Sequence, residues 1–121
     1  MEMPNVNMNQ EVPGPAPAAE HDPIFENIRN RLANTFQGIQ NVPTLYHNID
    51  IITNNEIIVI KRMTDWTEGI GLLQVHNTQF PNKQKHLHLY QTNLNNRANQ
   101  DLLNKIMSIC IQIQVSLTVE Q

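Results

Sequence analysis

The step from Asp22 to Pro23 divides the sequence more sharply than any other feature. Asp is a preferred N-cap because its carboxylate accepts hydrogen bonds from early helical amides, and Pro loses nothing at the first helical position. Residues 1–22 are rich in Pro and Asn and carry four acidic residues but no Lys or Arg. Such a segment buries too little apolar area to offset its ordering entropy. We therefore predict a disordered acidic tail over 1–22 and a single small domain over 23–121.

The first element of the predicted domain is an amphipathic helix that begins at Pro23. Its apolar side chains recur every three or four residues, which places them on one face of a helix. Gly38 and Pro43 are expected to end it. The apolar stripe consists of Phe25, Ile28, Leu32, Phe36 and Ile39.

The middle of the sequence indicates β-strands. Residues 45–52 and 57–63 are rich in β-formers and flank Thr53-Asn54-Asn55-Glu56, so they predict a β-hairpin. Residues 57–60 are apolar on both faces, which is typical of a central strand covered by a helix on at least one side. Two further strands are predicted over 70–76 and 85–91.

The last quarter of the sequence carries two competing patterns. Apolar residues between Ala98 and Leu117 fall on one side of a helical wheel and favour a helix over 97–114, whereas residues 109–119 alternate as a half-buried strand would. With the helix, the fold class is α+β: a two-layer sandwich in which a helix, three or four antiparallel strands and a second helix follow in order. Both helices are then expected on one face of the sheet.

Composition excludes several classes of protein. The eight Lys and Arg residues all lie after the tail, and this region also contains seven acidic residues, so the domain is near neutral. Its charge therefore indicates neither a membrane nor a nucleic-acid partner. Cys110 is the single cysteine, which excludes an intrachain disulfide. With no secretory signal and no bilayer-length apolar run, we expect a cytoplasmic or nuclear location and no membrane partner.

No pattern in the sequence predicts catalysis. His86 and His88 share one face of the predicted strand, but they lack further ligands at a recognisable spacing. Gly69-Ile70-Gly71 is an incomplete nucleotide-binding motif, and Cys110 lies on an apolar stripe as a buried thiol would. We therefore predict no enzyme activity, no catalytic or metal-binding residues, no cofactor and no small-molecule substrate.

The leading hypothesis is a non-catalytic protein–protein interaction module, a small adaptor subunit that joins a larger assembly through homo- or heterodimerisation. The reason is that the predicted helices and strands carry more apolar surface than one thin sheet can cover. The expected interaction residues are Trp66, Phe25, Leu32 and Phe36. The alternative hypothesis is a structured-RNA-binding domain that uses a basic strand edge, formed by Lys83, Lys85, His86, His88, Tyr90 and Arg97.

Overall fold

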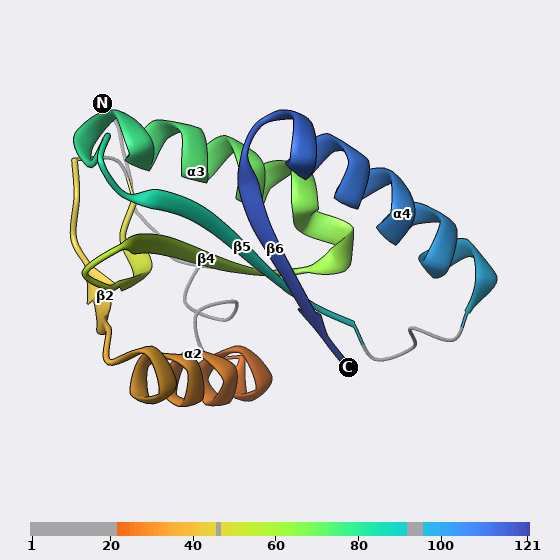
Figure 1. Ribbon diagram of the computed structural model, residues 1–121. Coiled ribbons are helices and arrows are strands. Elements are labelled where there is room, and N and C mark those ends of the chain that lie inside the picture. The colour runs from red at the N-terminus through yellow and green to blue at the C-terminus, as the bar shows by residue number, and fades with distance from the viewer. Residues whose placement is uncertain (1–21, 46, 92–95) are drawn as a thin grey trace, which may run out of the picture.

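A computed structural model describes residues 22–45, 47–91 and 96–121 of the chain. Apart from Asp22, the expected tail lies outside the described residues. The described elements follow in the order α2 (Pro23–Phe36), β2 (Ile39–Val42), β3 (Ile49–Ile52), β4 (Glu56–Arg62), the short 3₁₀ helix η1 (Met63–Asp65), α3 (Trp66–Gln79), β5 (Gln84–Tyr90), α4 (Arg97–Gln112) and β6 (Val115–Glu120). Figure 1 shows these helices gathered around one sheet.

The sheet is mixed, with strands in the order β2-β3-β4-β5-β6. The pairs β2–β3 and β3–β4 are antiparallel, whereas β4, β5 and β6 run parallel. The predicted hairpin is confirmed, with Ile51 opposite Ile58 and Ile52 opposite Ile57. The parallel pairs need crossover helices, and α3 and α4 supply them.

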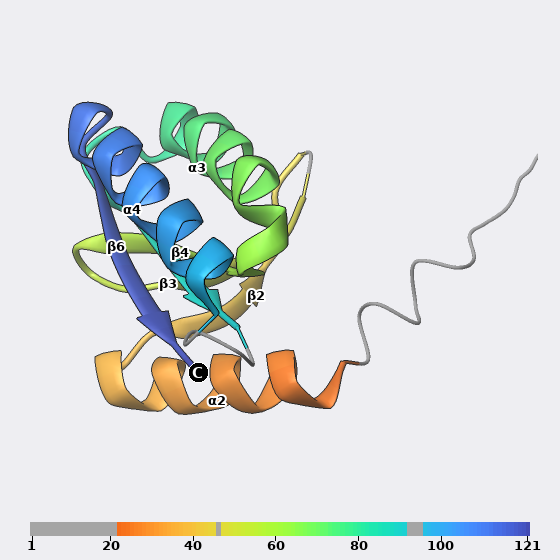
Figure 2. The same cartoon turned by 90° about the vertical axis from the view of Figure 1, so that its right-hand side faces the viewer.

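Helices cover both faces of the sheet, so the molecule has three layers. Figure 2 shows α2 on one side of the strands and α3 and α4 on the other. The larger core lies under α3 and α4, and it is made of Ile49, Ile57, Val59, Met63, Leu73, Leu87, Leu89, Ile106, Cys110 and Val115. The smaller core lies under α2 and consists of Ile28, Leu32, Ala33, Ile51, Ile58, Ile60 and Tyr90.

Helix α2 begins as the sequence predicts and ends earlier. The Asp22 carboxylate accepts a hydrogen bond from the Ile24 amide at 2.9 Å, and Pro23 is the first helical residue. The helix ends at Phe36 because Gln37 adopts a left-handed conformation with φ of 55°. Gly38 then passes so close to Ile51 that a Cβ atom there would collide with its side chain. Ile39, expected on the helix, therefore begins strand β2.

The predicted strand over 70–76 is wrong, because these residues lie within α3. Ile70 and Val75 prefer strands locally, but the parallel pairing of β4 with β5 requires a helix between them. Gly69 lets this helix approach the sheet, since a Cβ atom there would lie 2.7 Å from Leu87 Cδ1. The expected all-antiparallel sheet is therefore wrong. The expected two layers with both helices on one face are wrong as well, because α2 covers the face opposite α3 and α4.

Each of the two competing C-terminal patterns is partly right. The helix α4 extends to Gln112, and the strand β6 follows from Val115 to Glu120. The chain turns between them at Gln114, whose φ of 60° is rarely adopted by a residue other than Gly, Asn or Asp. Because Gln gives no turn signal, the boundary between helix and strand was hidden in the sequence.

Candidate functional site

The candidate site lies where strands β3 and β4 separate. Ile51 and Ile52 of β3 pair with residues of β4. One residue before this paired stretch, the Asp50 carboxylate accepts a hydrogen bond from the Ile60 amide of β4 at 2.8 Å. A side-chain oxygen thus takes the place of a backbone carbonyl as acceptor. We call the opening beside it the strand-split groove. It has a volume of about 1010 Å³ and is bounded by α2, the β2–β3 connection, β4 and the start of α3.

Charged side chains of both signs line the strand-split groove. The cations come from different elements: Arg29 from α2 and Lys61 and Arg62 from β4. His47, Asn41 and Asn48 add polar groups from the β2–β3 side. The carboxylates are Asp22, Glu26, Asp50, Asp65 and Glu68.

Asp50 is the least ordinary of these carboxylates. Burial raises its pKa to about 6, although the hydrogen bond from Ile60 and the charges of Lys61 and Arg29 oppose the shift. The group therefore gains or loses a proton close to neutral pH. A destabilised carboxyl with specific charged neighbours in a groove is a frequent feature of functional sites. It can donate a hydrogen bond when protonated and repels anions when ionised.

Lys61 presents its ammonium group to the groove from the middle of the sheet. Its Nζ atom lies 3.4 Å from a carboxylate oxygen of Glu68, and the two side chains are 23% and 62% exposed. The lysine is thus held by its strand, whereas the glutamate is solvated. An exposed ion pair of this kind contributes little to stability, so another anion can replace the Glu68 carboxylate.

A second cluster closes the groove at the carboxyl ends of β4 and β5. The Asp22 carboxylate accepts hydrogen bonds from Arg62 at 2.9 Å and from the Tyr90 hydroxyl at 3.1 Å. The Arg62 guanidinium also lies 5.9 Å from the centre of the Tyr90 ring. The hydrogen bond from Arg62 lowers the pKa of Asp22, while burial raises the pKa of Tyr90. The N-cap of α2 is therefore tied directly to the sheet.

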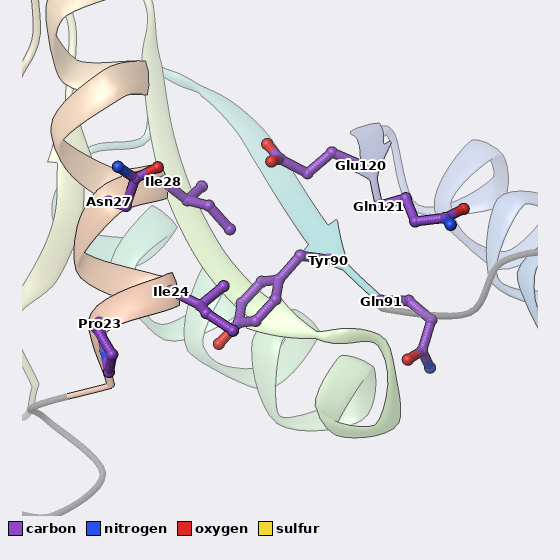
Figure 3. A pocket seen from close by; sticks show the side chains of 8 residues that line it. All are labelled: Pro23, Ile24, Asn27, Ile28, Tyr90, Gln91, Glu120 and Gln121. Atoms are coloured by element: carbon purple, nitrogen blue, oxygen red, sulfur yellow. The ribbon is translucent and has the colours of Figure 1, made fainter.

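A smaller pocket of about 300 Å³ lies on the other side of Tyr90. Figure 3 shows the Tyr90 ring beside Ile24, with Ile28 and Glu120 further along the pocket. The remaining lining residues are Pro23, Asn27, Gln91 and Gln121. With few polar groups aimed into it, this pocket offers contact area without a defined chemistry.

The RNA hypothesis required a basic strand edge, and the structure does not bring that set together on a surface. Lys83 donates to the carbonyls of Thr53 and Asn54, and Lys85 donates to the Ile113 carbonyl and the Gln74 side chain. Arg97 is exposed at the start of α4. His86, His88 and Tyr90, expected on a wet face, are only 5%, 5% and 7% exposed.

His86 and His88 are instead the buried members of a polar row beside α2, which also includes the more exposed Thr118 and Glu120. His86 Nε2 and His88 Nδ1 lie 2.8 and 2.6 Å from the Thr118 hydroxyl. His88 Nε2 lies 2.7 Å from the Glu120 carboxylate, which also accepts from Arg31 at 2.6 Å. Burial lowers the pKa of His88. The row links strands β5 and β6 to α2, which accounts for histidines on a strand without any ligand.

The four residues expected at a protein interface lie in different places. Leu32 is buried under α2, and Phe25 packs against the same smaller core. Trp66 packs against the larger core. Phe36 is 42% exposed, and its ring lies 6.2 Å from the His86 ring in a T-shaped arrangement. They do not form one surface, so the interface that they were expected to form stays a prediction.

The described residues give little support to a metal site, a reactive cysteine or a membrane-spanning helix. No group of three or more His, Cys, Asp or Glu residues among them could hold a metal ion. Cys110 is buried, and burial raises the pKa of its thiol, as expected of an inert core cysteine. In the part of the chain that the structure describes, no helix is long and apolar enough to span a bilayer.

Sequence reasoning missed Asp50 as a site residue and did not place Lys61 beside it. One signal for Asp50 was present, since it interrupts the apolar run Ile49-Asp50-Ile51-Ile52. A charged residue within such a run is costly to bury and points to a specific role. Nothing in the sequence places Lys61 and Arg29 near it, because their proximity depends on the pairing of β3 with β4 and on the position of α2.

Two proteins of Acanthamoeba polyphaga mimivirus are similar to this chain. "Putative KilA-N domain-containing protein L33" is 33% identical over 92 residues, which are 76% of this chain and 35% of that protein. "Putative KilA-N domain-containing protein R878" is 26% identical over 92 residues, which are 76% of this chain and 24% of that protein. The chain thus spans about a third and a quarter of their lengths. No family model and no solved structure matches it.

Proposed function

We propose that this domain is a non-catalytic DNA-binding module that holds the sugar–phosphate backbone in the strand-split groove. The similarity to L33 and R878, over 92 residues of this chain, is the observation that carries the proposal. Both are named for a KilA-N domain, and KilA-N domains form a DNA-binding family. The strand-split groove supports the proposal because its cations can contact phosphates.

The cations of the groove are suited to phosphates. Lys61 and Arg62 extend from the end of β4 and Arg29 lies on α2, so a strand of DNA in the groove meets cations from two elements, interspersed with the five carboxylates of the groove. A phosphate oxygen takes the place of the exposed Glu68 carboxylate beside Lys61. Such contacts fix the backbone without reading its sequence.

The carboxylates of the groove make this binding depend on pH. Below about pH 6 the buried Asp50 carboxyl is protonated, so it donates a hydrogen bond to a phosphate oxygen instead of repelling it. Affinity for DNA should therefore rise as the pH falls through about 6. With three cations, the groove is expected to bind weakly, and its affinity should fall with salt by about three counterions at most.

The test is fluorescence anisotropy of a labelled DNA duplex of roughly 20 base pairs at low salt. Lys61→Gln should weaken binding several-fold and reduce the salt dependence by about one counterion. Lys105→Gln is the matched control, because Lys105 is an exposed lysine on α4, across the sheet from α2. Circular dichroism establishes that both variants are folded.

Equal affinities for the Lys61 and Lys105 variants would remove the groove as the binding surface. Absence of any DNA binding at low salt would remove the proposed function. A single-stranded RNA competitor that displaces the duplex at lower concentration than unlabelled DNA would move the proposal from DNA to RNA.

A further inference from the structure

The two edges of the sheet differ in how they are protected. An edge strand exposes a row of backbone donors and acceptors that can pair with another chain. Strand β2 is only four residues long, and Asn41 interrupts its geometry with φ of 56°. Strand β6 has six residues, Val115–Glu120, without a Pro, Lys or Arg. On its outer side β6 meets no strand of the described residues.

An apolar strip on α4 accompanies the open edge of β6. Met107 and Ile111 are 45% and 75% exposed, although both are large apolar residues. Counted from the buried Ile106, they lie about 100° and 140° around the helix. In the right-handed crossover from β5 to β6, this side of α4 faces outward past β6 and away from α3. Figure 2 shows α4 and β6 together at the same margin of the molecule.

The charge distribution favours a second copy of this chain as the occupant. Gln100 and Asn104 lie between about 120° and 160° around α4 from Ile106, on the same side as Met107 and Ile111, so the strip itself is uncharged. The charged residues Arg97, Asp101 and Lys105 follow at about 180°, 220° and 260°, from the border of the strip round toward α3. A surface without charge meets its own copy without like-charge repulsion. Two-fold symmetry also satisfies both partners equally, because the same patch is used twice.

We propose that two copies of this chain associate through antiparallel pairing of their β6 strands, with Met107 and Ile111 of each α4 packed against the partner's helix. The two sheets then become one continuous sheet across the dimer axis. Strand pairing satisfies the open backbone groups of β6, and the helices exclude water on one side of the joint. This proposal does not depend on DNA binding.

The test is sedimentation of the full chain over a range of concentrations. Wild type should show a monomer–dimer equilibrium, and Ile111→Glu should weaken it at least about tenfold, because the two introduced carboxylates meet at the axis. Leu45→Glu is the matched control, since Leu45 is 85% exposed beside the other edge of the sheet. It should dimerise as wild type does. Thermal unfolding by circular dichroism verifies that the variants are folded.

A second measurement tests the strand pairing itself. Amide exchange of β6 should be slower at concentrations where the dimer is populated, with no comparable change in β2. A strictly monomeric wild type would overturn the proposal. A dimer that survives both Ile111→Glu and Ser116→Lys, or assemblies that grow without limit, would overturn it as well, because a two-fold joint at β6 closes after two copies.

Discussion

The two faces of the sheet are covered by different kinds of residues. Under α3 and α4 the large core cluster is apolar, from Ile49 to Val115, and His76 of α3 is the buried polar residue on this side. Under α2 a smaller apolar core shares the sheet with the polar row of His86, His88 and Glu120 and with the strand-split groove at Asp50. The comparison teaches that one face carries the larger apolar core and is expected to supply most of the stability, while the other holds the polar row and the strand-split groove.

Truncation of a core residue on each face should reveal this difference most strongly. Leu87 is fully buried under α3 and α4, whereas Leu32 is 8% exposed under α2. We expect Leu87→Ala to lower the free energy of unfolding by about 3–4 kcal/mol and Leu32→Ala by about 2 kcal/mol. Urea denaturation at pH 7 measures both. Equal losses would mean that the two faces contribute alike.

Asp50 should act in the opposite direction, because its carboxylate is a cost to the fold at neutral pH. Its pKa is 3.8 in ordinary surroundings and about 6 in the folded protein, so the folded state binds more protons between these values. The contribution of Asp50 to stability is therefore most favourable below about pH 4 and becomes unfavourable as the pH rises through about 6. Asp50→Asn keeps an acceptor for the Ile60 amide and removes the charge.

We expect Asp50→Asn to raise the free energy of unfolding by roughly 1–2 kcal/mol at pH 7, after allowance for partial exposure of the site. The gain should shrink towards zero near pH 4. Urea denaturation of wild type and variant at the two pH values gives the comparison. A loss of stability at pH 7 would show that the carboxylate supports the fold. The same variant should also lose the pH dependence of DNA binding.

The two faces were not equally accessible to sequence reasoning. The N-cap at Asp22 and the hairpin around residues 53–56 are local features, and both were predicted correctly. The apolar run Ile57–Ile60 also indicated a central strand covered by a helix, which the structure confirms. These inferences succeed because each depends on residues that are close in the sequence.

The failures all depend on contacts between distant residues. The helix α3 is required by the parallel partner that β4 finds in β5, although its own residues favour a strand. His86 and His88 alternate with Leu87 and Leu89 as predicted, but the face they share is buried because α2 lies over it and β6 supplies Thr118 and Glu120. Sequence alone gives no sign of that partnership.

Glu120 should affect stability less than the core residues do, and it shows how the polar row is held. Burial acts to raise the pKa of Glu120, but hydrogen bonds from Arg31 and His88 outweigh it, so the net shift is downward. A carboxylate with a lowered pKa stabilises the fold above its ordinary pKa of 4.5, and this contribution is lost as the pH falls. The polar row is therefore expected to loosen in acid.

Glu120→Gln should lower the free energy of unfolding by about 1 kcal/mol at pH 7. The neutral amide that replaces the carboxylate is a weaker hydrogen-bond partner for Arg31 and His88. Glu68→Gln, which removes an exposed partner of Lys61, should cost less than about 0.5 kcal/mol. Thermal and urea unfolding of the two variants at pH 7 and pH 4 separates them. If both variants behave alike at pH 7, the row contributes no more than a surface ion pair, and the stability of the α2 face comes from its small apolar core.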